Sequence, residues 1–205
     1  MQNLVLATRN PGKALELKEL LGADWTVQTV TELSGLPEID ETGTTFHDNA
    51  RLKSEGISAC LDPQTLVLAD DSGLEVDALD GEPGVYSARY AGADATDEAN
   101  NAKLLRELEV AAARNELGRK ARFRCVLSLA QGGKEIASFE GSCEGVIAPE
   151  RCGEGGFGYD PLFLPQGHDR CFAQMNSAEK AALSHRGQAL SKFQNWLKSR
   201  PAGGV

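Results

Sequence analysis

The sequence of 205 residues lacks the features of a protein that coats a polyanion, crosses a membrane or is secreted. Acidic residues outnumber basic ones by 30 to 21, and the net charge of −9 argues against a stable nucleic-acid or membrane partner. No apolar run approaches the length of a membrane span, and the first residues, MQNLVLATRN, have no basic segment before an apolar one. The five cysteines form no CxxC pair, which favours reduced, mostly buried thiols in a cytoplasmic protein over a zinc site.

Strand and helix patterns follow one another along the chain. Apolar runs predict strands over residues 3–8, 25–30, 65–69, 122–130 and 135–139. Helical periodicity predicts helices that begin near Pro11, Thr45 and Thr96, and a last helical region over residues 177–198. A hairpin signal, QGGK, joins the last two strands, so we expect an α/β fold with a mixed rather than a purely parallel sheet.

The segment TLVLADDSG is the strongest local indication of a functional site. Its apolar run 66–69 leads directly into Asp70 and Asp71, and each carboxylate costs free energy to bury unless a positive group meets it. We expect the strand to end there. The two aspartates would then lie at the carboxyl end of a strand, where α/β folds bind ligands. The acidic loop with Asp40 and Glu41 offers further oxygen ligands for Mg²⁺. A turn in which the aspartates cap local amides would give the same pattern.

Two lysines stand where a bound anion would need positive charge. The segment ATRNPGK places Lys13 at a turn from strand to helix, where free amides and the helix dipole favour phosphate. It is not a Walker loop, because Ala14 follows the lysine. Lys53 lies on the apolar stripe of the next helix, seven residues after Phe46. An exposed Lys13, and a Lys53 that extends along an apolar face to water, remain open alternatives.

Two further polar segments each allow more than one interpretation. Residues 153–158, GEGGFG, match GxGxxG, but Pro161 follows closely and blocks the helix that a Rossmann fingerprint requires. The segment can be a ligand-embracing loop with Phe157 as an aromatic platform, or a bare surface loop. The cluster SHRGQ, residues 184–188, can be solvated or can cap a helix, and no GxSxG elbow completes a catalytic triad.

Together these segments resemble the inosine/xanthosine triphosphate pyrophosphatases, which remove noncanonical purine nucleotides. The matching stretches occur in the family's order and span nearly the whole chain. They are LATRNPGK (6–13), ETGTTFHDNARLK (41–53), LADDSGLEVDALDGEPGVYSARYAG (68–92), GGFGYDPLF (155–163) and EKAALSHRGQAL (179–190). Arg9, Asp48 and Asn176-Ser177 depart from the family pattern, but none of them is a residue that the resemblance makes catalytic.

The resemblance implies one noncanonical purine NTP pyrophosphatase domain over residues 1–205. It implies an elongated mixed sheet flanked by helices, with two lobes around an active-site cleft. It also implies a Mg²⁺-dependent homodimer that converts ITP, dITP or XTP to the monophosphate and pyrophosphate. Asp71 would be the proton acceptor and a metal ligand, and Asp40 or Glu41 would supply another ligand. The implied nucleotide-binding residues are Thr8, Arg9, Asn10, Pro11, Gly12, Lys13, Lys53, Ser72, Phe157, Gly158, Tyr159, Asp160, Lys180, His185 and Arg186.

These residues support a mechanism of positioning and charge neutralisation, as phosphoryl chemistry requires. His185 and Arg186 could donate to the 6-oxo group of a purine and would meet an unfavourable amino group on adenine. They do not exclude guanine. Charge on the phosphates would be balanced by Lys13, Lys53 and Lys180. The alternatives are a pyrophosphatase for modified pyrimidines and a nucleotide-binding regulator without turnover; the long motif matches and the intact Asp70-Asp71 pair speak against them.

Overall fold

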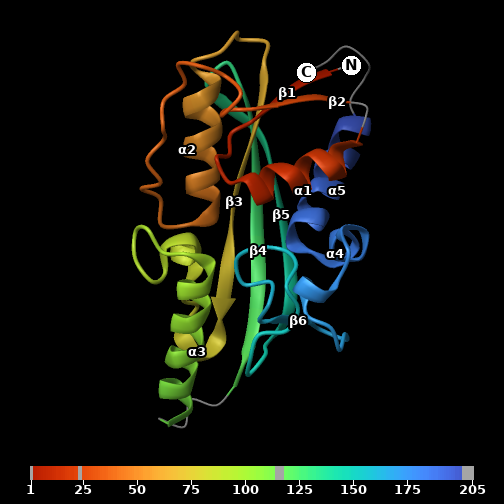
Figure 1. Ribbon diagram of the computed structural model, residues 1–205. Helices are drawn as coiled ribbons and strands as arrows, with labels where there is room; N and C mark the ends of the chain where they lie inside the picture. The colour runs from red at the N-terminus through yellow and green to blue at the C-terminus, as the bar shows by residue number, and fades with distance from the viewer. Residues whose placement is uncertain (1, 23–24, 114–117, 200–205) are drawn as a thin grey trace. The chain divides into compact units, whose positions relative to one another are not determined.

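The computed structural model describes residues 2–22, 25–113 and 118–199, which form a mixed six-stranded sheet flanked by helices (Figure 1). The strands are β1 (Gln2–Leu6), β2 (Trp25–Thr29), β3 (Leu66–Val76), β4 (Lys120–Gln131), β5 (Lys134–Ile147) and β6 (Phe163–Pro165), in the order β2-β1-β3-β4-β5-β6. The helices are α1 (Pro11–Leu21), α2 (Phe46–Ser58), α3 (Asp97–Ala113), α4 (Ser177–Leu183) and α5 (His185–Lys198). β1 pairs in parallel with β2 and β3, whereas β6 is antiparallel to β5, so the predicted mixed sheet is confirmed.

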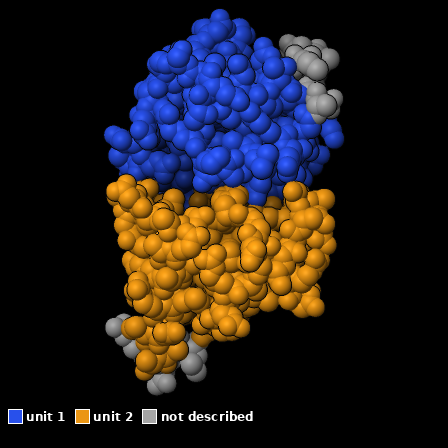
Figure 2. Space-filling view, viewed as in Figure 1, with its two compact units in different colours: residues 1–71, 125–141, 186–205 blue, residues 72–124, 142–185 orange. Residues whose placement is uncertain are grey.

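The chain forms two compact units, each built from separated segments (Figure 2). Unit 1 comprises residues 1–71, 125–141 and 186–205, and unit 2 comprises residues 72–124 and 142–185. The single domain over residues 1–205 stays a prediction, and residues 1, 23–24, 114–117 and 200–205 lie outside the described part. No helix within the described residues is both long enough and apolar enough to cross a bilayer.

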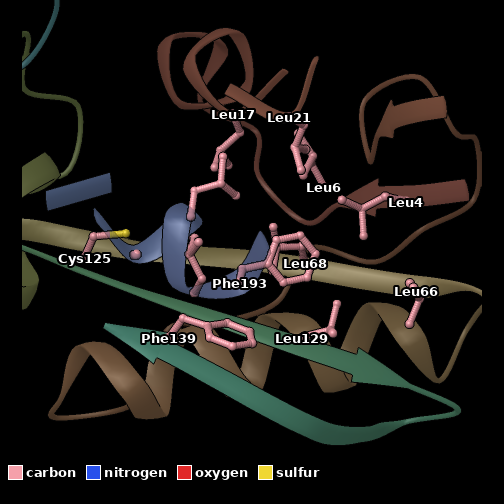
Figure 3. Packing of buried hydrophobic residues seen from close by; sticks show 13 residues of the cluster. Leu4, Leu6, Leu17, Leu21, Leu66, Leu68, Cys125, Leu129, Phe139 and Phe193 are labelled. Carbon is pink, nitrogen blue, oxygen red and sulfur yellow. The ribbon is translucent and has the colours of Figure 1, made fainter. Parts of the chain in front are cut away.

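The core of unit 1 follows from the alternation of side chains along β1 and β3. One face of these strands presents Leu4, Leu6, Leu66 and Leu68, which share a buried cluster with Leu17 of α1 and Phe193 of α5 (Figure 3). The opposite face presents Val5, Ala7, Val67 and Ala69, which share a second cluster with Ile57 of α2. Since successive strand residues point to opposite faces, helices on both sides require continuously apolar runs. This is why both strands are readily recognised in the sequence.

Several predicted boundaries are wrong: β5 continues to Ile147 and does not end at residue 139, and two further differences affect the site. β3 continues to Val76, so Asp70 and Asp71 lie inside a strand and not at its end. The helical region predicted over residues 177–198 is two helices, because Ser184 takes an extended backbone with φ −69° and ψ 154°. The capping box at the start of α2 is confirmed: Thr45 Oγ1 accepts the amide of Asp48 at 3.1 Å.

Unit 2 has its own core and a covalent link that the sequence did not reveal. Leu104 and Leu108 of α3 pack with Leu74 and Val76 of β3 in one cluster of buried residues. Cys152 and Cys171 form a disulfide, with their Cα atoms 6.3 Å apart. The expectation of reduced thiols is therefore wrong for this pair, because cysteine spacing does not show which residues the fold brings together. Cys125 and Cys143 are free and buried as expected, and Cys60 is free but exposed.

Candidate active site

Asp70 is the centre of a buried cluster of charges in unit 1. Its side chain is fully buried, and Oδ1 lies 2.6 Å from Nζ of Lys13 while Oδ2 accepts Nε of Arg186 at 3.0 Å. Burial alone would raise the pKa of Asp70, but Arg186 and Lys13 hold it well below its ordinary value. Both oxygens are thus occupied by cations of the protein. This arrangement explains how β3 can continue through two aspartates, and it assigns Asp70 to the framework of the site.

Asp71 has a different environment in the same unit. Its Oδ1 lies 3.0 Å from Nζ of Lys53, whereas its Oδ2 is buried without a hydrogen-bond partner. Burial raises the pKa of Asp71, and the nearby Lys53 and Lys13 offset only part of that effect. A buried carboxylate oxygen without a partner is costly and calls for an explanation. A metal ion or a water that binds with the substrate would supply the missing partner.

Lys53 connects Asp71 to the acidic loop. Its Nζ donates to Glu41 at 2.8 Å as well as to Asp71, and only 12% of its side chain is exposed. Burial would lower the pKa of Lys53, but Asp71 and Glu41 raise it above its ordinary value, so the lysine stays charged. The alternative in which Lys53 merely extends to solvent is therefore wrong. Its contact with a substrate phosphate stays a prediction.

The two acidic-loop residues that the sequence indicated as metal ligands, Asp40 and Glu41, differ in exposure and in contacts. Glu41 is half-buried and shares Lys53 with Asp71, whereas Asp40 is exposed. No group of three or more histidine, cysteine or acidic side chains suited to a metal occurs in the described residues. Two carboxylates with an open oxygen still fit Mg²⁺, which commonly takes one or two carboxylates and completes its shell with water and substrate phosphates. Glu41 and Asp71 are the two carboxylates that meet at Lys53, and their role as metal ligands stays a prediction.

The turn before α1 is held by hydrogen bonds from its amides to its own side chains. Asn10 caps the helix, since its Oδ1 accepts the amide of Lys13 at 3.0 Å, and Thr8 Oγ1 accepts the amide of Asn10 at 3.2 Å. Pro11 occupies the first helical turn, where no amide partner is needed. Arg9 and Asn10 are exposed, but Lys13 points to Asp70 and is only 15% exposed. The alternative of a plainly exposed Lys13 is therefore wrong.

In unit 2, Asp160 organises the glycine-rich loop. Its Oδ2 accepts the backbone amide of Phe157 at 3.0 Å and lies 2.5 Å from Nζ of Lys180. The Lys180 ammonium lies 4.8 Å from the centre of the Phe157 ring, within the range of a cation–π contact. Gly156 packs so closely on the Asp160 carboxylate that any Cβ there would clash. The interpretation as a bare surface loop does not fit these contacts.

The remaining predicted residues of unit 2 come from the glycine-rich loop, from β3 and from the first residue of α5. Tyr159 is buried and donates its hydroxyl to the carbonyl of Ser87 at 2.9 Å, a contact that supports the fold. Ser72 is half-buried in β3. His185 is buried and stacks on Phe123, with ring centres 4.7 Å apart and planes at 9°. Their contacts with a nucleotide stay predictions.

Arg186 belongs to unit 1, and its surroundings were not foreseen. Only 2% of its side chain is exposed, and besides Asp70 it contacts Glu16 of α1 through Nη1. Burial would lower the pKa of Arg186, but Asp70 and Glu16 raise it. The sequence did not indicate a role for Glu16, because an acidic residue in a predicted helix is not unusual. Arg186 is held in one orientation by two carboxylates, and its role toward a base stays a prediction.

Sequence reasoning also missed Asp97 and Asn101 at the start of α3. Asp97 Oδ2 accepts the amide of Gly158 at 2.6 Å, and Asn101 Nδ2 donates to the carbonyl of Gly158 at 2.8 Å. In the sequence both residues indicate only that a helix begins. The loop of Phe157 and Asp160 is thus tied to α3 as well as to Lys180.

These features define a class: a mixed α/β protein with buried carboxylates that are paired with lysine and arginine. The chain belongs to the Ham1 family, whose family model matches residues 4–196. A dITP/XTP pyrophosphatase of Oceanobacillus iheyensis is 46% identical over 200 residues, covering 96% of this chain and 98% of that protein. A dITP/XTP pyrophosphatase of Desulforamulus reducens is 52% identical over 195 residues, covering 95% of this chain and 94% of that protein.

Solved structures of the family have the same fold. The Staphylococcus aureus Ham1 protein is 43% identical with a TM-score of 0.83, covering 96% of this chain and 98% of that one. A HAM1 protein from Coxiella burnetii is 40% identical with a TM-score of 0.85, covering 98% of this chain and all of that one. The family resemblance noted in the sequence is therefore confirmed.

Proposed function

We propose that this protein is a nucleoside triphosphate pyrophosphatase that hydrolyses noncanonical purine nucleotides, namely dITP, XTP and ITP, to the monophosphate and pyrophosphate. Relatives named dITP/XTP pyrophosphatase, 44–52% identical over nearly the full chain, support this function. The observation that carries it is Asp71, with one oxygen held by Lys53 and the other buried without a hydrogen-bond partner. Such a carboxylate is suited to take a proton from a water that arrives with the substrate.

Mg²⁺ is the cofactor that this set of donors fits. Glu41 and Asp71 would hold it, since both are carboxylates that contact Lys53 and Asp71 has an open oxygen. When bound, Mg²⁺ supplies positive charge to the phosphate oxygens at which negative charge develops. Glu41 is the preferred second ligand over Asp40, because Asp40 is exposed.

The chain's own residues then act by holding charge and moving one proton. Lys53 fixes the Asp71 carboxylate by its contact with Oδ1, while Oδ2 has no hydrogen-bond partner in the protein. Asp71 accepts a proton as the water oxygen bonds to the α-phosphorus. The bond from that phosphorus to the bridging oxygen breaks, and pyrophosphate leaves with the bonding electron pair. The turn of residues 8–13, at the N-terminus of α1, would bind the phosphates.

The family resemblance also implies nucleotide-binding residues in unit 2. Phe157 offers a ring for stacking, and Lys180 offers a cation whose position Asp160 fixes. Selectivity for a 6-oxo purine would come from the donors His185 and Arg186. We further propose that the enzyme acts in the cytoplasm as a homodimer, as the family resemblance implies.

The direct test is pyrophosphate release from dITP, XTP, dUTP and dGTP, with Mg²⁺ and with a chelator in excess. We expect Mg²⁺-dependent release that is fastest for dITP and XTP. Preference for dUTP would instead favour a pyrimidine pyrophosphatase. Tight binding of dITP without release of pyrophosphate would favour a regulator and contradict the proposal.

A further inference from the structure

The first turn of α3 holds both peptide groups of Gly158. The amide of Gly158 donates to Oδ2 of Asp97 at 2.6 Å, and its carbonyl accepts Nδ2 of Asn101 at 2.8 Å. The same Nδ2 donates to the backbone carbonyl of Asp97 at 2.6 Å, so the Asn101 amide is fixed on its own helix. All three residues belong to unit 2. Gly158 is therefore clamped on both sides by two residues that are four apart in one helix.

The clamp acts on a turn whose shape carries the proposed nucleotide contacts. Gly158 has φ +61°, a left-handed conformation that glycine adopts without strain, and a Cβ there would meet nothing within 4 Å. The turn is closed from Phe157 to Asp160, because the amide of Asp160 donates to the carbonyl of Phe157 at 3.2 Å. Phe157 precedes the clamped residue directly. A shift of Gly158 would therefore change the position of the Phe157 ring relative to Lys180.

The environment of Asn101 suggests that holding Gly158 is its main role. Asn101 is only 1% exposed, and its Oδ1 is buried without a hydrogen-bond partner. An orphaned buried acceptor destabilises the fold, and a leucine of similar volume would avoid that cost. The advantage of asparagine at this position is that its amide nitrogen donates to the carbonyl of Gly158. Asp97, in contrast, is exposed, so water can solvate its carboxylate. The carboxylate therefore does not need the Gly158 amide as a partner for its own stability.

We propose that Asp97 and Asn101 are positioning residues, which hold the Phe157–Asp160 turn in its nucleotide-binding shape and act on substrate binding, not on the chemical step. This inference rests on the proposed function, because it assumes that the turn binds the nucleotide. It predicts a specific split in the kinetic constants: loss of the clamp raises KM for dITP and leaves kcat nearly unchanged.

The informative substitutions are Asn101→Leu and Asp97→Ala, with Asp97→Asn as the conservative variant. Asn101→Leu removes the orphaned oxygen but also the donor to the Gly158 carbonyl; since these two effects oppose each other, we expect little change in thermal stability and a KM raised about 3- to 10-fold. Asp97→Ala should raise KM by about tenfold or more, since its hydrogen bond is charge-assisted. Asp97→Asn keeps an acceptor oxygen and should restore most of the affinity. Glu98→Ala removes a neighbouring charge of the same first turn and should leave KM unchanged.

Hydrogen exchange provides a second readout that does not depend on turnover. In Asp97→Ala, a peptide that contains the Gly158 amide should exchange faster than in wild type, whereas Glu98→Ala should not change it. Normal KM values in both Asn101→Leu and Asp97→Ala would overturn the proposal, as would a loss confined to kcat. If Asn101→Leu does not fold, the KM values for dITP of Asp97→Ala and Asp97→Asn test the proposal: equal KM values in these two variants would overturn it. Wild-type protein that releases no pyrophosphate would refute the proposed function, while unchanged exchange at Gly158 would refute the clamp.

Discussion

Nζ of Lys53 lies 3.0 Å from Oδ1 of Asp71, at a point where the lysine also contacts Glu41 at 2.8 Å. The lysine thus joins the expected proton acceptor to the second carboxylate of the proposed metal site. Because Lys53 has two anionic partners, either one can be neutralised without leaving the lysine unpaired. This arrangement allows each charge of the site to be tested separately in a folded protein.

Asp71→Asn should lower kcat for dITP by about 100-fold or more, because an amide cannot accept the proton of the attacking water. The fold should remain stable, since Lys53 keeps Glu41 and burial already disfavours the charged form of Asp71. Pyrophosphate release and thermal unfolding, measured on the same preparation, check both statements. Turnover near the wild-type rate would exclude Asp71 as the base.

Lys53→Met should shift the acidic limb of the pH–rate profile upward by about one unit or more. Burial raises the pKa of Asp71 and Lys53 lowers it, so without the lysine the pKa rises further. The base must be ionised, and activity is therefore lost at a higher pH as the solution is acidified. KM for dITP should also increase if Lys53 contacts a phosphate. Lys192→Met, which changes an exposed lysine of the same unit, should leave the profile in place.

Glu41→Gln should raise the Mg²⁺ concentration needed for half-maximal activity, and Asp40→Asn should raise it less. The reason is that Glu41 shares Lys53 with Asp71, whereas Asp40 is exposed. A Mg²⁺ titration of pyrophosphate release in both variants provides the comparison. A larger effect for Asp40→Asn would reverse the assignment of the second ligand.

Asp70→Asn should destabilise the protein by about 3–5 kcal/mol, because it leaves buried Arg186 and Lys13 with one carboxylate fewer. For a chain of this size that corresponds to a Tm lower by about 6–20 °C. The pKa of Asp70 is depressed in the fold, so its contribution is full above the ordinary aspartate range and is lost as pH falls through the folded pKa. The difference between variant and wild type should therefore shrink in strong acid. Asp94→Asn, at an exposed position, should change Tm little.

The sequence allowed the mixed sheet to be predicted, for physical reasons that the structure makes plain, and it singled out the charged segments of the candidate site, whose contacts with a nucleotide stay predictions. β1 and β3 are covered on both faces, so their apolar runs are continuous and easily recognised. Helix starts such as Thr45 have a local hydrogen-bonding pattern that depends on adjacent residues alone. Patterns of this kind depend only on neighbouring residues, so they can be recognised in a sequence before the fold is known.

Contacts between distant residues could not be predicted in the same way. β3 was expected to end at Asp70, because its cations come from Lys13 and Arg186, far away in the chain. Glu16 and Arg186 are likewise brought together only by the fold. The clamp on Gly158 has the same origin, since Asp97 is 61 residues away and shows in the sequence only as the start of a helix.

The last prediction concerns selectivity between purine bases. Arg186→Ala should lower the ratio of kcat/KM for dITP to that for dATP by about 10- to 100-fold, the value of one charge-assisted hydrogen bond to a 6-oxo group. Asp70 and Glu16 hold the guanidinium in a fixed orientation, as a donor that reads a base requires. The variant should also be less stable, because Asp70 loses a cation, so both substrates must be measured well below its Tm. Equal losses for dITP and dATP would show that Arg186 acts only through Asp70, as part of the framework that holds Lys13.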